Sequence, residues 1–320
     1  MSNYNEINGL KVKVQSGDPS NPINGQVWYN SSSSALKVAE IQGTGAWASG
    51  GAIGLARTTS AAGTQTANVI MGGQMRNPPY GNVSNVEEYN GSSWSEVNNT
   101  PYAAGNVSGT GTQTAALVFG GYPNVTTTAE YDGTNWTSGG ALGTGRELTG
   151  GIGVQTAAMA AGGLIRPGTN SNAVEQYNGT SWAGAPNLNT GLYGRNGIGT
   201  TSAALASGGQ TSSVSTAVEE YNGSAWSTVN ARPYGAGSAM GSGTQTAALN
   251  YGGNPASELT TTVSYDGTNW ASAAAMAAGR SMGGGSPSGT STAALASAGR
   301  SSTASEEFTI PVGVVTITTS

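Results

Sequence analysis

The sequence contains no cysteine and no histidine, and it has only two phenylalanines among 320 residues. Without thiols the chain can form no disulfide and can use no thiolate nucleophile. Without imidazole it can hold neither a histidine-dependent catalytic triad nor a histidine metal site. We therefore expect no metal and no cofactor, and a chemistry limited to hydroxyl, carboxylate, amide and guanidinium groups.

Charge is also scarce. Charged residues make up 8% of the chain, against roughly 25% in an average soluble protein. The net charge is −5 with no basic patch, which disfavours a nucleic-acid partner. No apolar run approaches the roughly 20 residues of a membrane span, so we expect no membrane insertion. The segment Met1–Glu6 has neither the basic start nor the apolar stretch of a signal peptide, which predicts synthesis in the cytoplasm without one.

What the chain has in abundance is glycine, with 52 residues, together with serine, threonine, alanine and asparagine. Low charge with much glycine and serine is also typical of disorder. Regularly spaced tryptophan, tyrosine and β-branched residues argue against disorder here, because each stretch of chain carries its own core formers. The composition favours an all-β protein with short strands and many turns.

A short phrase recurs along most of the chain: a tyrosine, an Asn-Gly or Asp-Gly pair, and a tryptophan five residues after the tyrosine. A run of small apolar residues ending in paired glycines precedes each copy, as in Thr114–Gly121. The tryptophans recur about every 45 residues. They are Trp47, Trp94, Trp136, Trp182, Trp226 and Trp270. Such a strict period predicts a repeat architecture with one tryptophan in each repeat.

Each repeat divides into four short β-prone stretches, here called a to d in chain order. Stretch a is rich in glycine and alanine, b is the apolar run before the glycines, c ends at the tyrosine, and d starts at the tryptophan. The Asn-Gly and Asp-Gly pairs fall between c and d, where a tight hairpin needs residues that accept positive φ. Four strands at this period predict the blade of a β-propeller.

The ends of the repeat region, residues 43–309, predict closure of a ring. The first repeat has a tryptophan stretch at Trp47 but no stretches a to c before it. The last has a to c, ending at Glu306-Glu307-Phe308, but no tryptophan after it. Pairing the two ends completes a sixth four-stranded blade and removes the open sheet edges. The phrases Pro101–Gly105 and Pro233–Gly237 also match, a hint of two half-rings.

Residues 1–42 lie outside the repeat. Gly25–Asn30 and Ala35–Val38 flank the serine run Ser31–Ser34, which predicts a β-hairpin. So few apolar residues would struggle to fold alone. We expect this segment to pack on the repeat domain, on copies of itself or on another protein. Residues 310–320 read as one further strand, Val312 onward, whose partner the sequence leaves open.

The double glycine, the Tyr-(Asn/Asp)-Gly pair and the spaced tryptophan resemble the kelch repeat over about residues 43–309. The phrase Gly-Thr-Gln-Thr-Ala-Ala-Leu is similar to kelch-like repeats in structural and tail-fibre proteins of marine phages, including cyanophages. Gly17–Asn30 resembles a segment of phage tail and virion proteins. The resemblance implies a six-bladed kelch-like propeller in a virion, with residues 1–42 attaching it to other tail proteins. These repeats are slightly shorter than usual kelch repeats.

Enzymatic sites are disfavoured. The pairs Glu87-Glu88, Glu219-Glu220 and Glu306-Glu307 could suggest the two carboxylates of a glycosidase, but neighbours in a strand point to opposite faces. Asp266–Trp270 has the wrong spacing for the Asp box of sialidases, another six-bladed family. Kelch-type copper oxidases need histidine and cysteine. We interpret the repeated tryptophans as blade packing rather than as a sugar-stacking series.

Recognition is predicted on one face of the ring. In an a–b–c–d blade, the b–c and d–a connections emerge together, and the b–c connections vary in length. Variable loops on a rigid scaffold commonly carry recognition, and Tyr and Arg are enriched in binding hot spots. The candidates on this face are Arg57, Arg76, Tyr80, Tyr102, Tyr122, Arg146, Arg166, Arg195, Tyr234 and Arg280. The competing interpretation is that these arginines cap strand ends or bond loop carbonyls.

The resemblance to phage proteins, together with the positions of the variable loops, implies a non-enzymatic virion protein, a tail fibre or tail-associated protein. Its propeller face would bind a glycan or protein on the host surface. A purely structural virion subunit, whose loop face contacts neighbouring virion proteins, is the alternative, and a sugar-processing enzyme is a weaker one. The sequence leaves the receptor, the host and self-association into a homo-oligomer open.

Overall fold

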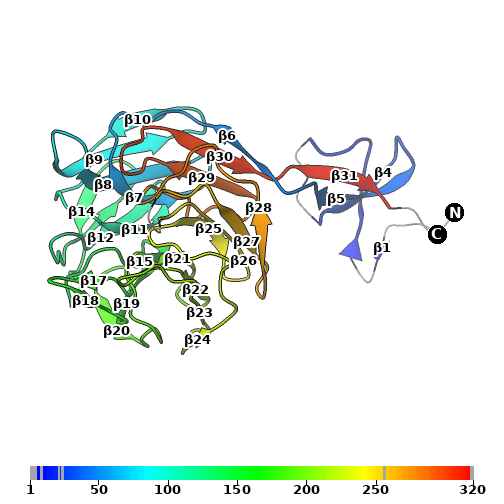
Figure 1. Cartoon of the computed structure of the whole chain (residues 1–320). Coiled ribbons are helices and arrows are strands. Elements are labelled where there is room, and N and C mark those ends of the chain that lie inside the picture. The colour runs from blue at the N-terminus through cyan, green and yellow to red at the C-terminus, as the bar shows by residue number, and fades with distance from the viewer. Residues whose placement is uncertain (1–5, 8–9, 21, 23–24, 255–256, 318–320) are drawn as a thin grey trace. The chain divides into compact units, whose positions relative to one another are not determined.

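The computed structural model describes residues 6–7, 10–20, 22, 25–254 and 257–317. The chain forms two compact units, which Figure 1 shows. Unit 1 consists of Met1–Ala46 with Thr309–Ser320, and unit 2 consists of Trp47–Phe308. The residues after the repeat thus belong with the N-terminal segment instead of forming a separate tail. None of the described residues belongs to a helix with the length and apolarity that a membrane span requires.

Unit 2 is all β and consists of antiparallel sheets that follow one another along the chain. The first sheet holds β7 (Thr58–Gly63), β8 (Asn68–Met75), β9 (Gly81–Tyr89) and β10 (Trp94–Val97). The second holds β11 (Ser108–Thr112), β12 (Ala115–Phe119), β13 (Thr128–Tyr131) and β14 (Trp136–Ser138). The third holds β15 (Gly150–Val154), β16 (Ala157–Ala161), β19 (Val174–Tyr177) and β20 (Trp182–Ala185).

The fourth sheet holds β21 (Asn196–Gly199), β22 (Ala204–Ser207), β23 (Val218–Tyr221) and β24 (Trp226–Thr228). The fifth holds β25 (Met240–Thr244), β26 (Ala247–Tyr251), β27 (Thr262–Tyr265) and β28 (Trp270–Ala273). In all five, the strands pair in chain order. A small hairpin, β17 (Leu164–Ile165) with β18 (Thr169–Asn170), lies in the connection between β16 and β19.

The sixth sheet joins the two ends of the repeat region. Its strand order is β29 (Ala293–Ser297), β30 (Ser305–Thr309) and β6 (Ala46–Ser49). Trp47 of β6 lies with its ring 5.3 Å from that of Phe308 on β30. The predicted innermost strand is replaced by irregular chain that makes two isolated bridges to β29, Gly284 to Ser297 and Thr290 to Ala293. The sixth sheet therefore has three strands and not the expected four.

The predicted turns between the third and fourth strands are present in the five four-stranded sheets. In the first, Tyr89 pairs with Trp94, and Gly91 has φ +90°. The Oδ1 atom of Asn90 accepts hydrogen bonds from the backbone N–H groups of Ser92 and Ser93 at 3.0 Å each. The side chain thus satisfies backbone groups that the tight turn leaves unpaired. In the repeated Asn-Gly and Asp-Gly pairs, the glycine allows the positive φ of the tight turn and the side chain before it accepts the backbone hydrogen bonds.

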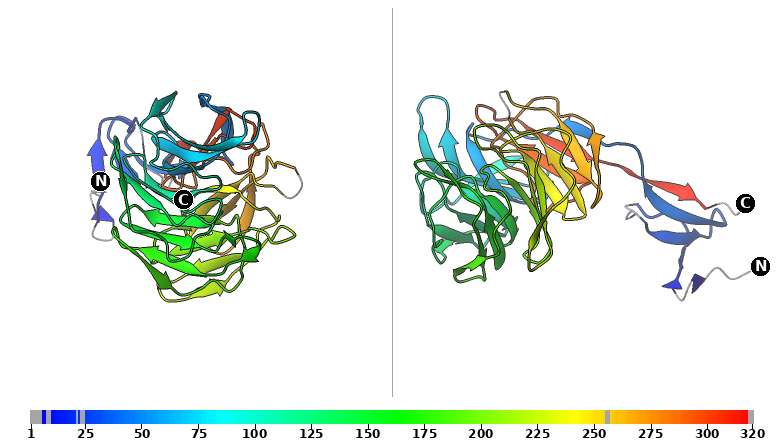
Figure 2. Two further views of the ribbon diagram at one scale, coloured as in Figure 1. Left: turned by 90° about the vertical axis from the view of Figure 1, so that its left-hand side faces the viewer. Right: turned by 60° about the horizontal axis from the view of Figure 1, so that its bottom comes forward.

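The sheets of unit 2 are arranged radially around a common centre, a propeller-like arrangement that Figure 2 shows in its left view. The first strands of neighbouring sheets contact one another: β7 contacts β11, then β15, β21 and β25 follow in turn. Glycine permits this crowding. A Cβ atom on Gly151 of β15 would lie 2.5 Å from the carbonyl oxygen of Gly109 on β11, closer than any side chain tolerates. The high glycine content serves this close approach of inner strands.

Unit 1 contains a sheet of order β3 (Lys13–Gln15), β4 (Val27–Asn30), β5 (Ala35–Ile41) and β31 (Val312–Thr316), together with a two-stranded sheet of β1 (Glu6–Ile7) and β2 (Leu10–Lys11). β4 and β5 form the predicted hairpin around the serine run. β31 pairs with β5, the partner that the sequence left open. Trp28 is fully buried, and its Nε1 donates to Asp18 Oδ1 at 3.0 Å.

Candidate binding face

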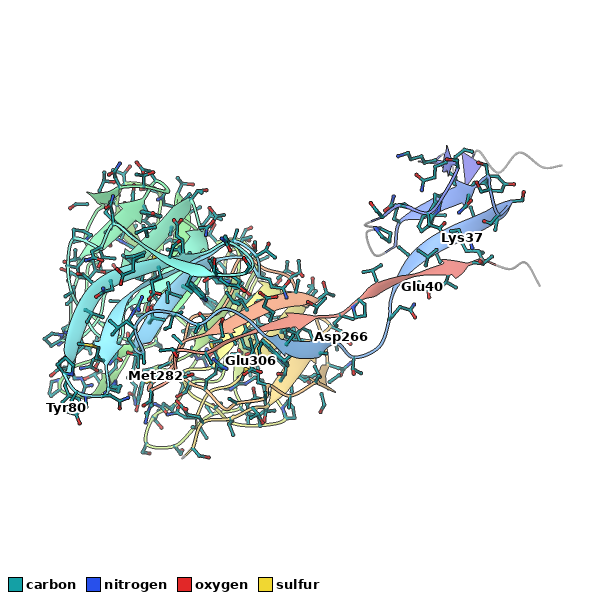
Figure 3. The ribbon with its side chains drawn as sticks, turned by 90° about the horizontal axis from the view of Figure 1, so that it is seen from above. Lys37, Glu40, Tyr80, Asp266, Met282 and Glu306 are labelled. Atoms are coloured by element: carbon teal, nitrogen blue, oxygen red, sulfur yellow. The ribbon has the colours of Figure 1, made fainter. Side chains whose placement is uncertain are left out.

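Unit 2 has two chemically different ends. At one end, Gln113, in the turn between β11 and β12, donates to the carbonyl of Tyr89, the last residue of β9. The turn after the first strand of one sheet therefore lies beside the turn after the third strand of the preceding sheet. At the other end, Tyr122 after β12 forms a bridge with Gly105 before β11. We call this second end the loop face. Tyr80 belongs to the loop face, and Asp266 belongs to the turn between β27 and β28 at the opposite end. Figure 3 labels both residues, which lie on opposite sides of unit 2.

Four of the candidate arginines do not line an accessible surface. Arg57, Arg146, Arg195 and Arg280 are at most 4% exposed. Each forms an ion pair with a buried glutamate on the third strand of its own sheet, at distances between 2.5 and 2.8 Å. The pairs are Arg57–Glu87, Arg146–Glu175, Arg195–Glu219 and Arg280–Glu306. This placement corrects the expectation that these arginines offer a binding surface.

The glutamates of these pairs are further bound by the backbone. The Oε2 atom of Glu175 accepts a hydrogen bond from the N–H of Gly143 at 2.6 Å, and Arg146 Nη1 donates to the carbonyl of Ala173 at 2.7 Å. Burial lowers the pKa of Arg146, and the charge of Glu175 opposes that shift. Buried charges persist only when they are paired and hydrogen-bonded, and here both conditions hold. These groups stabilise the sheets, although the Nε atoms of Arg146 and Arg280 and the guanidinium nitrogens of Arg195 are buried without a hydrogen-bond partner.

The second glutamate of each Glu-Glu pair points the other way, as the strand period requires. Its carboxylate accepts a hydrogen bond from a tyrosine of the next sheet: Tyr131 donates to Glu88 and Tyr265 donates to Glu220, both at 2.9 Å. Tyr177 donates in the same way to Glu130, which follows Ala129 rather than a second glutamate, at 2.5 Å. Burial and this carboxylate raise the pKa of Tyr177 to about 12. The two carboxylates of a pair therefore serve two separate contacts and do not form one acid–base site.

The six repeat tryptophans begin the outermost strands, and five of them pack against the tyrosine of their own sheet with ring centroids 4.7–5.0 Å apart. Trp47 packs instead on Phe308. Indole N–H groups reach neighbouring chain, as Trp136 does with the carbonyl of Asn98 at 2.8 Å. The tryptophans therefore hold the sheets of unit 2 together, both by packing and by hydrogen bonds.

Two candidate tyrosines, Tyr102 and Tyr234, are also largely enclosed. Burial raises the pKa of both, and neither hydroxyl has a hydrogen-bond partner. The ring of Tyr234 carries the guanidinium carbon of Arg232 at 5.0 Å. Arg232 is 2% exposed, and its Nη2 donates to the carbonyl of Ala236 at 2.9 Å. These residues fill space beneath the loop face.

The remaining candidates, Arg76, Tyr80, Tyr122 and Arg166, are exposed. Arg166 and Tyr122 lie together, with the guanidinium carbon 5.3 Å from the ring centroid. Arg166 Nε also donates to Glu147 Oε1 at 2.5 Å, and 44% of the arginine side chain remains exposed while the glutamate side chain is fully buried. One edge of the guanidinium is thus anchored, and the rest of the group faces solvent over an aromatic ring.

A hydrogen-bonded network extends from this pair. Asn106 Nδ2 donates to the second oxygen of Glu147 at 2.7 Å, and Arg76 Nη2 donates to Asn106 Oδ1 at 3.4 Å. Asn124 exchanges two hydrogen bonds with the backbone of Arg166, at 2.8 and 3.1 Å. Residues from the first three sheets therefore meet on the loop face and hold two arginines in fixed positions.

Arg300, in the connection after β29, adds a third exposed arginine near Arg76. Desolvation lowers the pKa of Arg76, and the charge of Arg300 lowers it further. Tyr80, which is 73% exposed, is the most exposed of the large apolar side chains among the described residues.

Sequence reasoning missed Arg300, although its position directly after Ala298-Gly299, the degenerate copy of the paired glycines, could have placed it on this face. It also missed Asn106, Asn124 and Glu147, whose side chains carry no local signal for a network.

The loop face therefore presents fixed cations and exposed aromatic rings on a chain of net charge −5. Guanidinium groups bind carboxylate, sulfate or phosphate oxygens, and exposed tyrosines pack on apolar or sugar faces. Among the described residues, no three acidic side chains lie close enough together to hold a metal ion.

A cavity of about 130 Å³ lies at the centre of unit 2. Several residues from the start of each sheet's inner chain contribute to its wall, among them Ser60, Val107, Thr149, Arg195, Ala239 and Gly283.

Comparisons with known proteins add no identity: no family model matches the chain, and no curated protein is significantly similar to it.

Proposed function

We propose that this chain is a non-enzymatic binding protein whose unit 2 is a closed six-bladed propeller that presents the loop face to an anionic or glycan-bearing surface. The observation that carries the proposal is the anchored network of Arg76, Tyr122 and Arg166, which holds guanidinium and aromatic groups exposed and preorganised. Preorganised side chains lose little conformational entropy on binding.

Ring closure is supported by contacts that repeat around the unit and then join the last sheet to the first. Tyr131 and Tyr177 each bond to a glutamate of the preceding sheet, and Tyr89 of the first sheet bonds in the same way to Glu307 of the sixth, at 2.5 Å. Backbone N–H groups at the inner strand starts also donate from sheet to sheet, and Thr59 N donates to Met282 O at 3.0 Å. A linear array would leave Tyr89 and Thr59 without these partners.

The kelch-like resemblance to phage tail proteins makes a host-cell surface the proposed ligand source and a virion tail the proposed location. In that setting unit 1 attaches the chain to other tail proteins. The alternative, a structural subunit whose loop face contacts neighbouring virion proteins, uses the same side chains with a different partner. The anchored cations suit an acidic protein surface as well as an acidic glycan.

The test compares binding of the fluorescently labelled full chain to host cells and to purified virion proteins. Replacing the exposed groups in the variants Tyr80→Ala and Arg76→Gln should weaken cell binding about tenfold or more, the size of a hot-spot loss. Arg166 is unsuitable as a first choice, because removing it leaves Glu147 buried and unpaired. Weakened binding to virion proteins alone would favour the structural alternative.

Val154→Ala is the matched control. Val154 is 47% exposed and lies at the other end of unit 2, next to Gln155, which bonds to the carbonyl of Tyr131. This variant should bind as the unchanged protein does. Equal binding by all three variants to every surface would overturn the proposal.

A further inference from the structure

The four-stranded sheet of unit 1 has two faces of different character. On one face Trp28 and Ala39 are fully buried, and Asp18 accepts hydrogen bonds from Trp28 and from Asn30. On the other face, the register aligns a row of apolar side chains across all four strands. Val14 pairs with Tyr29, which pairs with Leu36; in the next row Val27 and Val315 both pair with Val38.

We call this second face the apolar face. It consists of Val14, Val27, Tyr29, Leu36, Val38, Val315 and, two residues beyond Val315, Ile317. Tyr29, Leu36 and Val38 are partly buried, and the other four side chains are exposed. Val14 is 52% exposed, Ile317 40% and Val315 37%. A single exposed valine is ordinary, but a contiguous apolar patch that crosses a whole sheet marks an interaction site.

The chemistry of the apolar face limits what can cover it. Among the described side chains of the four strands, the ionisable groups on this side of the sheet are the phenol of Tyr29 and the carboxylate of Glu40, which is paired with Gly313. A strongly charged partner would therefore find little to pair with. Unit 1 as a whole has no net charge, because Lys11, Lys13 and Lys37 balance Glu6, Asp18 and Glu40. The net charge of −5 belongs entirely to unit 2.

We infer that the apolar face packs against the same face of a second copy of this chain. Domains are built from at least two packed layers, and unit 1 contributes a single four-stranded layer to this side. Sheets that pack face to face keep their strand directions within about 30° of each other because of their twist, and a second copy supplies a sheet of the same twist. Two neutral units with apolar faces also meet without the charge repulsion that two copies of unit 2 would experience. Figure 3 shows this sheet, with Lys37 and Glu40 labelled on β5.

The strand β31 offers a matched pair of test positions. Val314 and Val315 are neighbours, are both 37% exposed and point to opposite faces of the sheet. Only Val315 belongs to the apolar face. The variant Val315→Lys places a charge within the inferred interface, and Val314→Lys places the same charge outside it. Val14→Lys, on β3, repeats the test at the far side of the apolar face.

The experiment measures the mass of the full chain by light scattering after size exclusion, across a range of concentrations. The unchanged chain should give a multiple of 31.7 kDa. Val315→Lys and Val14→Lys should shift the mass to 31.7 kDa at concentrations where Val314→Lys remains associated. Near-ultraviolet circular dichroism of the tryptophans should be unchanged in all three variants.

Three results would overturn the inference. The unchanged chain could run at 31.7 kDa at every concentration, which would mean that another protein or another part of the chain covers the face. Val314→Lys could dissociate the protein as fully as Val315→Lys, which would place the contact elsewhere on β31. Both face variants could stay associated, which would place it outside unit 1. None of these results depends on whether the loop face binds a host surface.

Discussion

Unit 2 contains two kinds of sheet, and their difference shows how the repeat is stabilised. The first, third, fourth and sixth sheets each bury an arginine against a glutamate of the third strand. In the second sheet the arginine and glutamate positions hold Ala104 and Ala129, and in the fifth they hold Ala236 and Val263. No described sheet keeps the glutamate at this position without an arginine to pair with it.

This pattern has a direct physical reason. Half of a buried ion pair costs far more than the complete pair gains, because the remaining charge is left without compensation in a medium of low dielectric constant. The fourth sheet makes the same point differently. The position that holds Arg146 in the third sheet holds Leu192 in the fourth. The arginine of the fourth sheet, Arg195, lies three residues after Leu192 and still forms the ion pair with Glu219. What the fold requires is a neutralised glutamate, and the source of the cation can vary.

The second and fifth sheets have neither partner at these positions. Both bring in a tyrosine, Tyr102 or Tyr234, from the matching Pro-Tyr phrases of the connections before their first strands. The fifth sheet also buries Arg232, whose guanidinium packs on Tyr234 and donates to Asn250 and to the carbonyl of Ala236 in place of a carboxylate. The two sheets lie three repeats apart, in keeping with the half-ring similarity in the sequence.

The largest expected change in the free energy of unfolding comes from replacing one partner of a buried ion pair by alanine. Glu175→Ala should lower the free energy of unfolding by about 3–5 kcal/mol, because Arg146 is left buried without its counter-charge. The double variant Arg146→Ala, Glu175→Ala copies the second sheet and should recover part of that loss. Urea unfolding of the two single variants and the double variant gives the coupling energy. Strictly additive losses would show that the pair is not a unit.

A smaller effect is expected at the contacts between sheets. Tyr177→Phe removes the hydroxyl that donates to Glu130 and should cost about 1.5–3 kcal/mol, the range for hydrogen bonds to charged groups. The sixth sheet supplies a natural counterpart, since Phe308 stands where the other sheets have tyrosine and Ser264 stands where its glutamate partner would be. A loss below a few tenths of a kcal/mol would contradict the assigned role.

The same tyrosine predicts a pH dependence. The pKa of Tyr177 is raised to about 12 in the folded chain, against about 10 in an unfolded one. Its contribution to stability is therefore complete below pH 10 and is lost as the pH rises from about 10 to 12. Denaturant midpoints measured across this window should fall for the unchanged chain and fall less steeply for Tyr177→Phe. Parallel curves would contradict the shift.

The smallest effect is expected in the sheets without an ion pair. Tyr102 has a buried hydroxyl with no hydrogen-bond partner. Tyr102→Phe should leave the free energy of unfolding unchanged or raise it by up to about 1 kcal/mol, because a buried unsatisfied group is removed. The same measurement used for Tyr177→Phe serves here. A loss as large as in that variant would mean that Tyr102 has a partner after all.

Much of the fold was predictable from local signals. The period of tryptophan and glycine, the Asn-Gly turns and the opposed directions of neighbouring glutamates depend on a few consecutive residues, and the structure contains the corresponding strands and turns. The replacement of an inner strand by irregular chain in the sixth sheet was not predicted. Its stretch after Gly283 is rich in small residues, like the inner strands elsewhere, so composition does not distinguish it.

The candidate site was predictable only in part. Arg57 and Arg76 are residues of the same type in neighbouring connections, and sequence reasoning treated them alike. Arg57 is buried because Glu87, thirty residues further along the chain, lies beside it. Among the described residues Arg76 forms no direct ion pair; it reaches Asn106 at the surface, which in turn donates to Glu147. Whether an arginine holds the scaffold together or faces a ligand depends on contacts between distant residues.

By itself the sequence determined the repeat, its turns and the composition of every strand, because these follow from periodicity and from backbone preferences within a few residues. Tertiary structure alone decided which arginines are neutralised, which strand pairs with β31 and which side of the unit 1 sheet is left apolar and exposed. Those outcomes depend on burial and register between segments far apart in the chain, as with β31 and β5, which are separated by all of unit 2.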